Sequence, residues 1–502
     1  MTYTNAFRRS VAVATLAAGL AACNNDTLTN LNQNPNAPTT VEPQLLFTSG
    51  TASAMFYLRS TSFEHGLSSL WVQHYAEVQY PEADVYIPRD ATIEALWTNL
   101  YAGGLQDYKQ ILAQAKDPLQ IAPALTMRSF VFNEMTDLWG DIPYSDANAG
   151  DKGAAALTPK YDSQQTIYDS LFAAYARSAT LLKSAGTGYG DADPIYGGNA
   201  TKWLKLNNAL HARAAMRLSK VDGGSGGRAQ TQLVNALTKQ GALMTSNADN
   251  GKLVWPGDGV SDNPLFTNWK TRDDQRISKT LVDSLTSYGD PRLAQYADST
   301  TNSTGSACSK RTPPQPAGCA TVYVGAQNGR LTQPAGTLAA TSRPSSINVR
   351  AQTSPSYIMT YAELLFIEAE AAERGWVTTL GTAASLYNAA ITASMQQWGV
   401  DNASIAAYLA NPKVVYTPGT AGLQKIAFQK WIALFDAETD AYSEWRRTGV
   451  PTLTPGPDAA INTVPRRLTY PPIESSLNGA NRDAAVAAQG GAALTNKVWW
   501  DK

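Results

Sequence analysis

The stretch IMTYAELLFIEAEAAERGW, residues 358–376, decides the fold that we expect for this chain of 502 residues. Its apolar side chains recur at the spacing of one helix face, and Gly375-Trp376 interrupts the run before a second stripe begins. The two stripes comprise Ile358, Tyr361, Ala362, Leu365, Ala369 and Ala372, then Leu386, Tyr387, Ala390 and Ile391. The pattern predicts a helix-turn-helix over residues 358–397 of the kind found in tetratricopeptide repeats, although the full repeat consensus is not satisfied.

Further stripes predict a mostly α-helical body from about Val41 to the end of the chain. Apolar residues recur at helical spacing in 127–139, which Gly140 ends, and in 203–214 and 423–435. Near the start of the body, one buried face is expected to hold Leu45, Leu46, Met55, Phe56 and Leu58. The closing residues Val498-Trp499-Trp500 predict an apolar tail that docks back on the body.

One long region lacks helical periodicity. Between about 222 and 350 the chain is rich in Gly, Asn, Asp, Ser and Thr, interrupted by the short apolar runs 252–255 and 321–324. We expect a loop-rich excursion there, with short strands and a few helical turns, within a single body that spans residues 41–502.

The N-terminus has the parts of a secretory signal. Arg8 and Arg9 precede an apolar run of 12 residues, 11–22, which is too short to span a bilayer. Leu20-Ala21-Ala22-Cys23 then forms a small-residue lipobox. We expect cleavage after residue 22, a diacylglycerol and an acyl chain such as palmitate on Cys23, and a polar tether over residues 23–40. An ordinary cleaved signal with a chance cysteine is the alternative.

The composition excludes some classes of partner and favours others. The formal net charge is −1, which gives no electrostatic footprint for nucleic acid. Charged residues make up only 16% of the chain, whereas Tyr (23) and Trp (12) are plentiful. Such a surface suits neutral polar ligands, although most of the aromatic residues belong in a core.

The chain carries no recognisable catalytic motif, so we expect a protein that is not an enzyme and has no cofactor. Its three histidines lack metal-ligand spacing, and the loop acids Asp258, Asp262, Asp273 and Asp274 permit Ca²⁺ but lack the spacing of an EF-hand. Cys308 and Cys319 lie in a stretch rich in Ser, Thr, Pro and Gly and are expected to form a disulfide in an oxidising compartment. A glycoside hydrolase needs only two carboxylic acids placed correctly in space, so that alternative stays open.

We expect structural roles, and not catalysis, for the acidic residues on the predicted helices. Glu363, Glu368, Glu370 and Glu373 share one helix, where we expect them to form a solvated or polar-packed face. Asp137 and Asp141 flank Trp139, where capping and turn roles are expected.

Aromatic residues in one stretch are the candidates for ligand binding that the residues themselves indicate. Trp71-Val72-Gln73-His74-Tyr75 continues through Tyr80 and Tyr86, and it combines rings with hydrogen-bonding groups, as surfaces that stack sugars or peptide side chains do. At helical spacing, Trp71 and Tyr75 could instead belong to a plain core stripe.

Several segments together resemble the SusD/RagB family of outer-membrane lipoproteins. They are NPNAPT (34–39), TDLWGDIPY (136–144), DPIYGG (193–198), DPRL (290–293), TYAELLFIEAEA (360–371) and RRLTYP (466–471), followed by Leu477-Asn478. Each segment alone is weak, but their order and spread cover nearly the whole chain after the lipobox.

The resemblance implies a SusD-like helical fold, with tetratricopeptide-like helix pairs that support a loop-rich ligand-binding region. It implies a lipid-anchored protein at the outer membrane that captures glycans, or in some members peptides, and passes them uncleaved to a SusC-like TonB-dependent barrel. Asn24 and the absence of an acidic run depart from a strong surface-export signal, so the periplasmic face stays open. Carried over by region, the ligand-binding candidates are Trp71, Tyr75, Tyr80, Tyr86, Phe266, Trp269 and Tyr323. A surface hydrolase and an assembly scaffold without a ligand are the rival hypotheses.

Overall fold

The computed structural model describes residues 41–300 and 322–502. The expected lipidation site Cys23 and the expected disulfide Cys308–Cys319 lie outside these residues. Residues Pro43–Lys502 form one compact unit.

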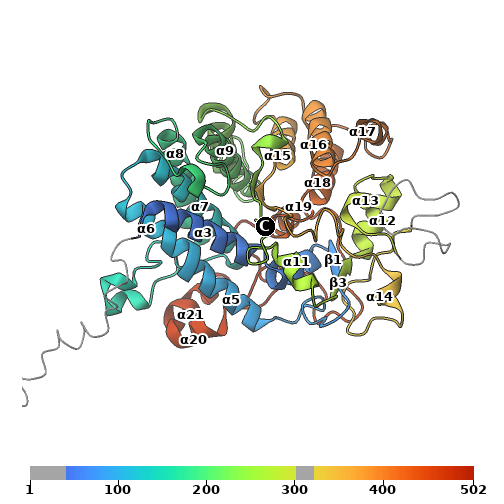
Figure 1. Ribbon diagram of the computed structural model, residues 1–502, viewed down its shortest axis with the longest axis horizontal. Helices are drawn as coiled ribbons and strands as arrows, with labels where there is room; N and C mark the ends of the chain where they lie inside the picture. The colour runs from blue at the N-terminus through green and yellow to red at the C-terminus, as the bar shows by residue number, and fades with distance from the viewer. Residues whose placement is uncertain (1–40, 301–321) are drawn as a thin grey trace, which may run out of the picture. The chain divides into compact units, whose positions relative to one another are not determined.

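The fold is mostly helical, as predicted (Figure 1). The longer helices are α3 (Pro43–Leu58), α5 (Asp90–Leu100), α6 (Gln106–Gln114), α7 (Pro118–Trp139), α8 (Gln164–Leu181), α9 (Ala200–Arg217), α12 (Lys279–Tyr288), α15 (Tyr361–Glu373), α16 (Ala383–Gln397), α17 (Asn402–Leu409), α18 (Thr420–Ala433), α19 (Glu438–Thr448) and α21 (Gly479–Ala488). Shorter ones are α4 (Ser69–Trp71), α10 (Arg228–Val234), α11 (Pro264–Trp269), α13 (Leu293–Tyr296), α14 (Thr337–Ala340) and α20 (Pro472–Leu477). Short stretches of π- or 3₁₀-helix cover Thr61–Ser68, Tyr101–Leu105, Gly150–Lys152, Ala154–Leu157, Gly190–Ala192, Asn235–Lys239 and Asn247–Asp249.

Local signals explain where α7 begins and ends. The Asp117 carboxylate accepts a hydrogen bond from the Leu119 N–H, and Pro118 occupies the first turn, where a missing N–H costs nothing. At the other end Gly140 adopts a φ of 84°, which L side chains rarely adopt, and donates its N–H to the Thr136 carbonyl. The stop predicted at Gly140 is confirmed.

The helix pair predicted from the opening stretch is also confirmed. Thr360 caps α15 by accepting from the Glu363 N–H, and Thr382 caps α16 by accepting from the Ser385 N–H. The two helices bury one shared apolar cluster, which includes Ala362, Leu365, Phe366 and Ala369 against Leu386, Tyr387, Ala390 and Ile391. Ile358 is an exception to the prediction: it lies in strand β4 (Ser356–Met359), because the cap at Thr360 starts the helix after it.

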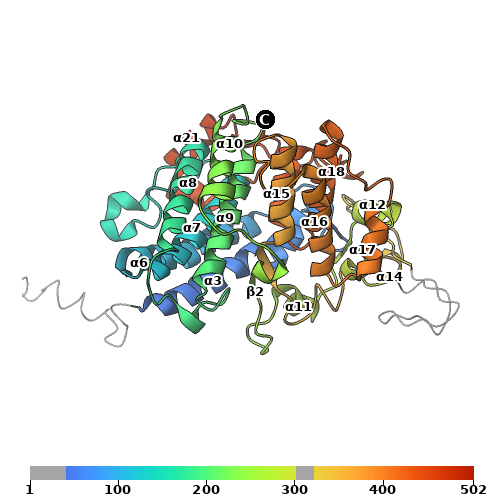
Figure 2. The same ribbon diagram turned by 90° about the horizontal axis from the view of Figure 1, so that it is seen from above.

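Helices from both halves of the chain stand in one row. Figure 2 shows α8, α9, α15, α16 and α18 side by side, and α9 from the first half contacts α15 from the second. The C-terminal tail docks as predicted: Trp500 is fully buried, and its indole N–H donates to Asp137 at 2.8 Å. Within the described residues, no helix combines the length and the apolar character needed to cross a membrane.

Strands are few and short. Strand β1 (Tyr75–Glu77) pairs antiparallel with β3 (Gln275–Ile277), with Tyr75 opposite Ile277, and β2 (Gly251–Leu253) pairs antiparallel with β4. Of the two apolar runs in the loop-rich region, 252–255 overlaps strand β2, whereas residues 322–324 of the other run form no strand, and nearby Ala326 forms a single bridge to Ser278.

The expectation for α3 is partly wrong. Met55 and Leu58 are fully buried, but Phe56 is 45% and Leu45 is 65% exposed. The buried stripe of α3 runs through Phe47, Thr51, Ala54 and Met55, so the next residue, Phe56, turns away from the core.

A cluster of buried ion pairs connects helices α9, α15 and α19. Arg213 on α9 is only 4% exposed; it donates two hydrogen bonds to Glu363 of α15 and lies 2.9 Å from the Asp440 carboxylate of α19. Arg447 on α19 likewise donates to Glu370 of α15 at 2.6 Å. Glu363 and Glu370 are therefore polar-packed rather than solvated, and Asp137, expected to have a capping or turn role, pairs with Arg217 at 3.3 Å.

The first prediction concerns Arg213. Replacing it with Met keeps much of the side-chain volume but leaves the carboxylates of Glu363 and Asp440 buried without their partner. We expect Arg213→Met to lower the free energy of unfolding by about 4 kcal/mol, measured by urea titration. Adding Glu363→Met should restore part of that loss. Arg177→Met, at an exposed position of α8, is the control and should stay within about 0.5 kcal/mol of the parent protein. A loss below about 1 kcal/mol for Arg213→Met would contradict this role.

The second prediction concerns Glu368. Burial raises the pKa of its carboxyl group to about 8. The folded protein holds this proton between the ordinary pKa of a glutamate and pH 8, whereas the unfolded chain releases it. The free energy of unfolding therefore falls as pH rises through that window. At pH 8, Glu368→Gln should be more stable than the parent protein by about 2 kcal/mol, and the difference should shrink towards pH 5. The exposed Asp191→Asn is the control, and an equal pH slope in all three proteins would refute the assignment.

Candidate ligand-binding site

Two loops that are far apart in the chain meet beside the β1–β3 pair. The loop after β1 carries Tyr80, and the turn that leads into β3 carries Trp269 to Asp274. The Val78 N–H donates to the Asp274 carbonyl at 2.7 Å, which extends the strand pairing by one step. Figure 1 shows α11, which ends at Trp269, next to β1 and β3. The antiparallel pair thus brings the loop that carries Tyr80 next to the turn that follows Trp269.

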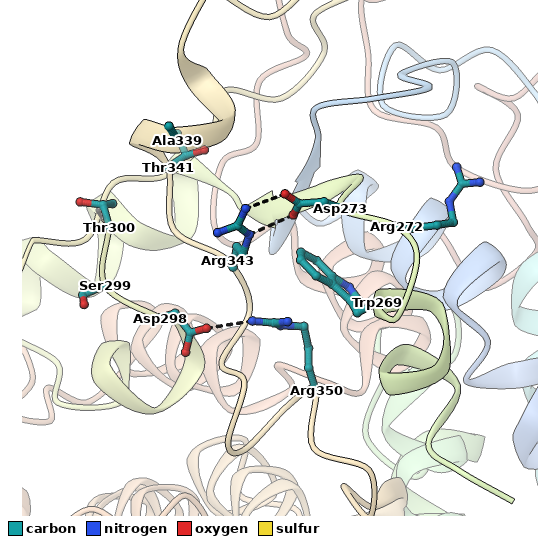
Figure 3. Close-up of a pocket in the computed structure, with 10 residues that line it drawn as sticks. All are labelled: Trp269, Arg272, Asp273, Asp298, Ser299, Thr300, Ala339, Thr341, Arg343 and Arg350. Carbon is teal, nitrogen blue, oxygen red and sulfur yellow. Dashed lines mark hydrogen bonds and ion pairs between the residues drawn. The ribbon is translucent and has the colours of Figure 1, made fainter. Parts of the chain in front are cut away.

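A cavity of about 340 Å³ opens on one side of Trp269 (Figure 3), and we call it the arginine cavity. It is lined by Trp269, Arg272, Asp273, Asp298, Ser299, Thr300, Ala339, Thr341, Arg343 and Arg350. Arg343 donates to both carboxylate oxygens of Asp273, at 3.0 and 2.6 Å, and Arg350 donates to Asp298 at 2.8 Å. These ion pairs fix the walls of the cavity.

Asp273 stays ionised in this setting. Partial burial alone would raise its pKa, but hydrogen bonds from Arg343 and Arg276 outweigh that effect and lower the pKa below its usual value. Arg276 lies on β3 and is fully buried, so Asp273 joins the strand to the segment that carries Arg343.

Stacking holds the ring of Trp269. The Arg350 guanidinium lies 4.2 Å from the ring centroid, a cation–π distance, and Figure 3 shows the ring between Asp273 and Arg350. The indole N–H has no hydrogen-bond partner among the described residues, whereas the core residues Trp71 and Trp500 both donate theirs. The position of Trp269 is therefore set by its Arg350 contact and not by a hydrogen bond from the indole.

A second cavity, of about 420 Å³, lies on the Tyr80 side of Trp269, and we call it the tyrosine cavity. Its lining comprises Gln79, Tyr80, Trp269, Lys270, Thr271, Arg272, Asp273 and Asp274. Tyr80 is 57% exposed, and the Arg272 guanidinium lies 4.7 Å from its ring centroid. Arg89 donates to the Tyr80 carbonyl and to Glu77 of β1, which braces a backbone with a φ of 54° at Tyr80. Two half-open aromatic rings thus share one cavity with amide, hydroxyl and ammonium groups.

The structure separates the seven predicted binding residues into two groups. Trp71, Tyr75 and Tyr86 are at most 3% exposed and offer no surface to a ligand in this conformation. Trp71 packs edge-to-face on Tyr442, and Tyr75 stacks on Phe435, so both are core residues, the alternative that their spacing had left open.

The other four predicted residues are accessible. Tyr80 and Trp269 line the tyrosine cavity together. Phe266 is half-buried and lies under the Lys270 ammonium at 4.7 Å, and Tyr323 is half-buried but lines neither cavity.

Sequence reasoning missed the arginines of the site. Arg272, Arg343 and Arg350 belong to no motif, and the ion partner of Arg343 lies 70 positions away in the chain. The loop acids considered for Ca²⁺ are engaged by the protein: Asp262 accepts from Lys270 at 2.9 Å, and Asp273 accepts from Arg343 and Arg276. Within residues 41–300 and 322–502, no group of three or more His, Cys, Asp or Glu is arranged to hold a metal ion.

A family of SusD-like proteins, described as "Starch-binding associating with outer membrane", matches residues 35–471. A search of curated proteins found no sequence similar to this chain.

Several solved structures are similar over nearly their whole length. A chitin-binding protein is 31% identical, with a TM-score of 0.75 and coverage of 92% of this chain and 100% of that one. A chitin-binding SusD homolog from Flavobacterium johnsoniae is 26% identical, with a TM-score of 0.77 and coverage of 91% and 98%. A SusD homolog from Bacteroides ovatus ATCC 8483 is also 26% identical, with a TM-score of 0.77 and coverage of 92% and 99%.

Proposed function

This chain belongs to the SusD-like family, and we propose that it captures a neutral glycan on Tyr80 and Trp269 and releases it uncleaved. The observation that carries the proposal is the pairing of these two accessible rings in the tyrosine cavity. Aromatic faces stack on the apolar faces of sugar rings, and nearby polar groups bind the hydroxyls at the ring edges. Gln79, Thr271 and Lys270 supply such groups.

The names of similar structures favour one class of glycan. Two of the similar proteins are described as chitin-binding, at 31% and 26% identity, whereas the family description names starch. We propose oligosaccharides of chitin as the first ligands to test, with starch oligosaccharides of equal length beside them. Peptide capture, the other ligand class of the family resemblance, serves as the comparison.

Charge pairing at the site argues against hydrolysis. A glycoside hydrolase needs a carboxylic acid that keeps its proton near neutral pH, which requires a raised pKa. Asp273 has the opposite shift, because hydrogen bonds from Arg343 and Arg276 hold its pKa down despite partial burial. Asp298 is paired with Arg350. Prolonged incubation should therefore leave the length of a bound oligosaccharide unchanged.

The proposal extends to an anchor and a partner. Cys23 closes a lipobox at the end of a secretory signal, which supports a lipid anchor at the outer membrane, facing the cell surface. We propose that the protein passes its ligand to a SusC-like TonB-dependent barrel in that membrane. Moderate affinity and fast release would suit such a transfer.

The third prediction tests the aromatic pair. Trp269→Ala and Tyr80→Ala should each weaken binding of a chitin hexasaccharide roughly thirtyfold, about 2 kcal/mol, because each removes a stacking surface. Isothermal titration calorimetry measures the effect. Trp376→Ala is the matched control, since Trp376 is also half-buried and also lies near an arginine, with Arg374 at 5.1 Å, but it lines neither cavity.

Two outcomes would count against glycan capture at this site. Equal losses for Trp376→Ala and Trp269→Ala would assign the effect to general destabilisation. Release of shortened sugars by the parent protein would favour the hydrolase hypothesis instead.

The fourth prediction tests the partner and the anchor. Mass spectrometry of a tagged copy, solubilised gently from its own outer membrane, should find a TonB-dependent barrel in stoichiometric amount. The same spectra should find diacylglycerol and an acyl chain on Cys23. If no barrel co-purifies, the transfer of ligand to such a partner is refuted. If Cys23 carries no lipid, the lipid anchor is refuted.

A further inference from the structure

A third cavity, like the tyrosine cavity, is lined in part by residues of α11. Its volume is about 530 Å³, and we call it the hydroxyl groove. The residues of its lining that matter here are Phe56, Tyr57, Ser62, Thr92, Thr267 and Asn268. They come from α3, the π-helical turn after it, α5 and α11, so the groove is built by elements that the core already fixes.

Two aromatic side chains form one wall of the hydroxyl groove. Phe56 is 45% exposed, in contrast to its buried neighbour Met55, and Tyr57 is half-buried beside it. Their rings meet edge-to-face, with centroids 5.2 Å apart and planes at 86°, and Phe56 also meets Trp255 edge-to-face at 6.5 Å. These contacts hold the Phe56 ring in place while part of it stays open to solvent.

The other walls of the groove carry polar side chains that are available to hydrogen-bond a ligand. Among the described residues, the side chains of Ser62, Thr92, Thr267 and Asn268 have no hydrogen-bond partner. Each can both donate and accept a hydrogen bond, as sugar hydroxyls do. By contrast, the side chain of Thr61 is engaged with the Pro264 carbonyl and shapes the groove instead.

The hydroxyl groove carries almost no net charge. Asp262 is the one carboxylate or cation in its lining, and Lys270 neutralises it at 2.9 Å. Asp262 also accepts from the Gly259 N–H and from Gln352, which fixes the loop whose tip, Val260, is 92% exposed at the groove. An uncharged ligand with many hydroxyls matches this lining better than an ionic one does.

The hydroxyl groove and the tyrosine cavity adjoin each other. Asn268 lines the groove and the next residue, Trp269, lines the tyrosine cavity. The ion pair between Asp262 of the groove and Lys270 of the tyrosine cavity lies across the same boundary. An extended ligand held at Trp269 can therefore reach the groove by crossing the short helix α11.

We propose that the hydroxyl groove is a second glycan subsite, which binds the continuation of the same chain that Tyr80 and Trp269 hold. This inference rests on the proposed function, because it takes its ligand from there. A second subsite makes affinity depend on chain length: a short oligosaccharide fills only the tyrosine cavity, whereas a long one gains the contacts of Phe56 and of the free hydroxyl and amide groups.

The fifth prediction compares a disaccharide and a hexasaccharide of the same linkage by calorimetry. Phe56→Ala should weaken the hexasaccharide roughly tenfold and leave the disaccharide unchanged. Ser62→Arg, which places a long side chain in the groove without touching the core, should have the same selective effect. Leu45→Ala on α3 is the matched control, because Leu45 is 65% exposed on the same helix but does not line the groove. Trp269→Ala should weaken both sugars.

Three other outcomes would each refute the second subsite. If Trp269→Ala weakens both sugars while Phe56→Ala and Ser62→Arg change neither, the subsite is refuted and the proposed function stands. If none of the variants matters, both proposals fail together. If the groove variants alter binding of an unstructured peptide but not of the hexasaccharide, the groove is a peptide site and the glycan assignment is wrong.

Discussion

The buried ion pairs around Arg213 are the constraint on which the rest of the fold depends. Removing a guanidinium from water is expensive, and the cost is offset only when carboxylates meet it with good geometry, as Glu363 and Asp440 do here. The requirement fixes α9, α15 and α19 against one another more strictly than apolar packing alone would. Asp440 also pairs with Arg59, which follows α3, and Arg59 donates to the Tyr357 carbonyl of β4. The charge cluster therefore also holds the end of α3, where Phe56 reaches the surface.

Ion pairs also shape the candidate ligand-binding site, where the charged groups are more exposed than those around Arg213. Pairing of β1 with β3 joins two distant loops, and ion pairs of Asp273 and Asp298 with arginines hold the segments around Trp269. These partners hold the Trp269 ring where it lines both the arginine cavity and the tyrosine cavity. Preorganisation of this kind lowers the entropic cost of binding, which matters for a protein that must also release its ligand.

Local sequence signals predicted the helices well and the site only in part. The caps at Thr360 and Thr382 and the stop at Gly140 act within a few residues, so the elements they bound could be read from the sequence. The burial of Glu363 could not be read from the sequence, because its partner Arg213 lies 150 positions away. Trp71 and Tyr80 belong to one aromatic run, yet Trp71 is buried and Tyr80 is exposed, and the backbone has positive φ values at Gln73 and at Tyr80 itself. The predicted Trp269 is accessible, whereas the arginines around it carry no sequence signal.

A crystal structure with a bound chitin hexasaccharide is the most direct test of the central claim, that Tyr80 and Trp269 form the glycan platform. The account predicts one sugar ring stacked on Trp269 in the tyrosine cavity, a neighbouring sugar against Tyr80, and the chain continuing across α11 towards Phe56. Sugar density elsewhere on the protein, with both rings left bare, would contradict it.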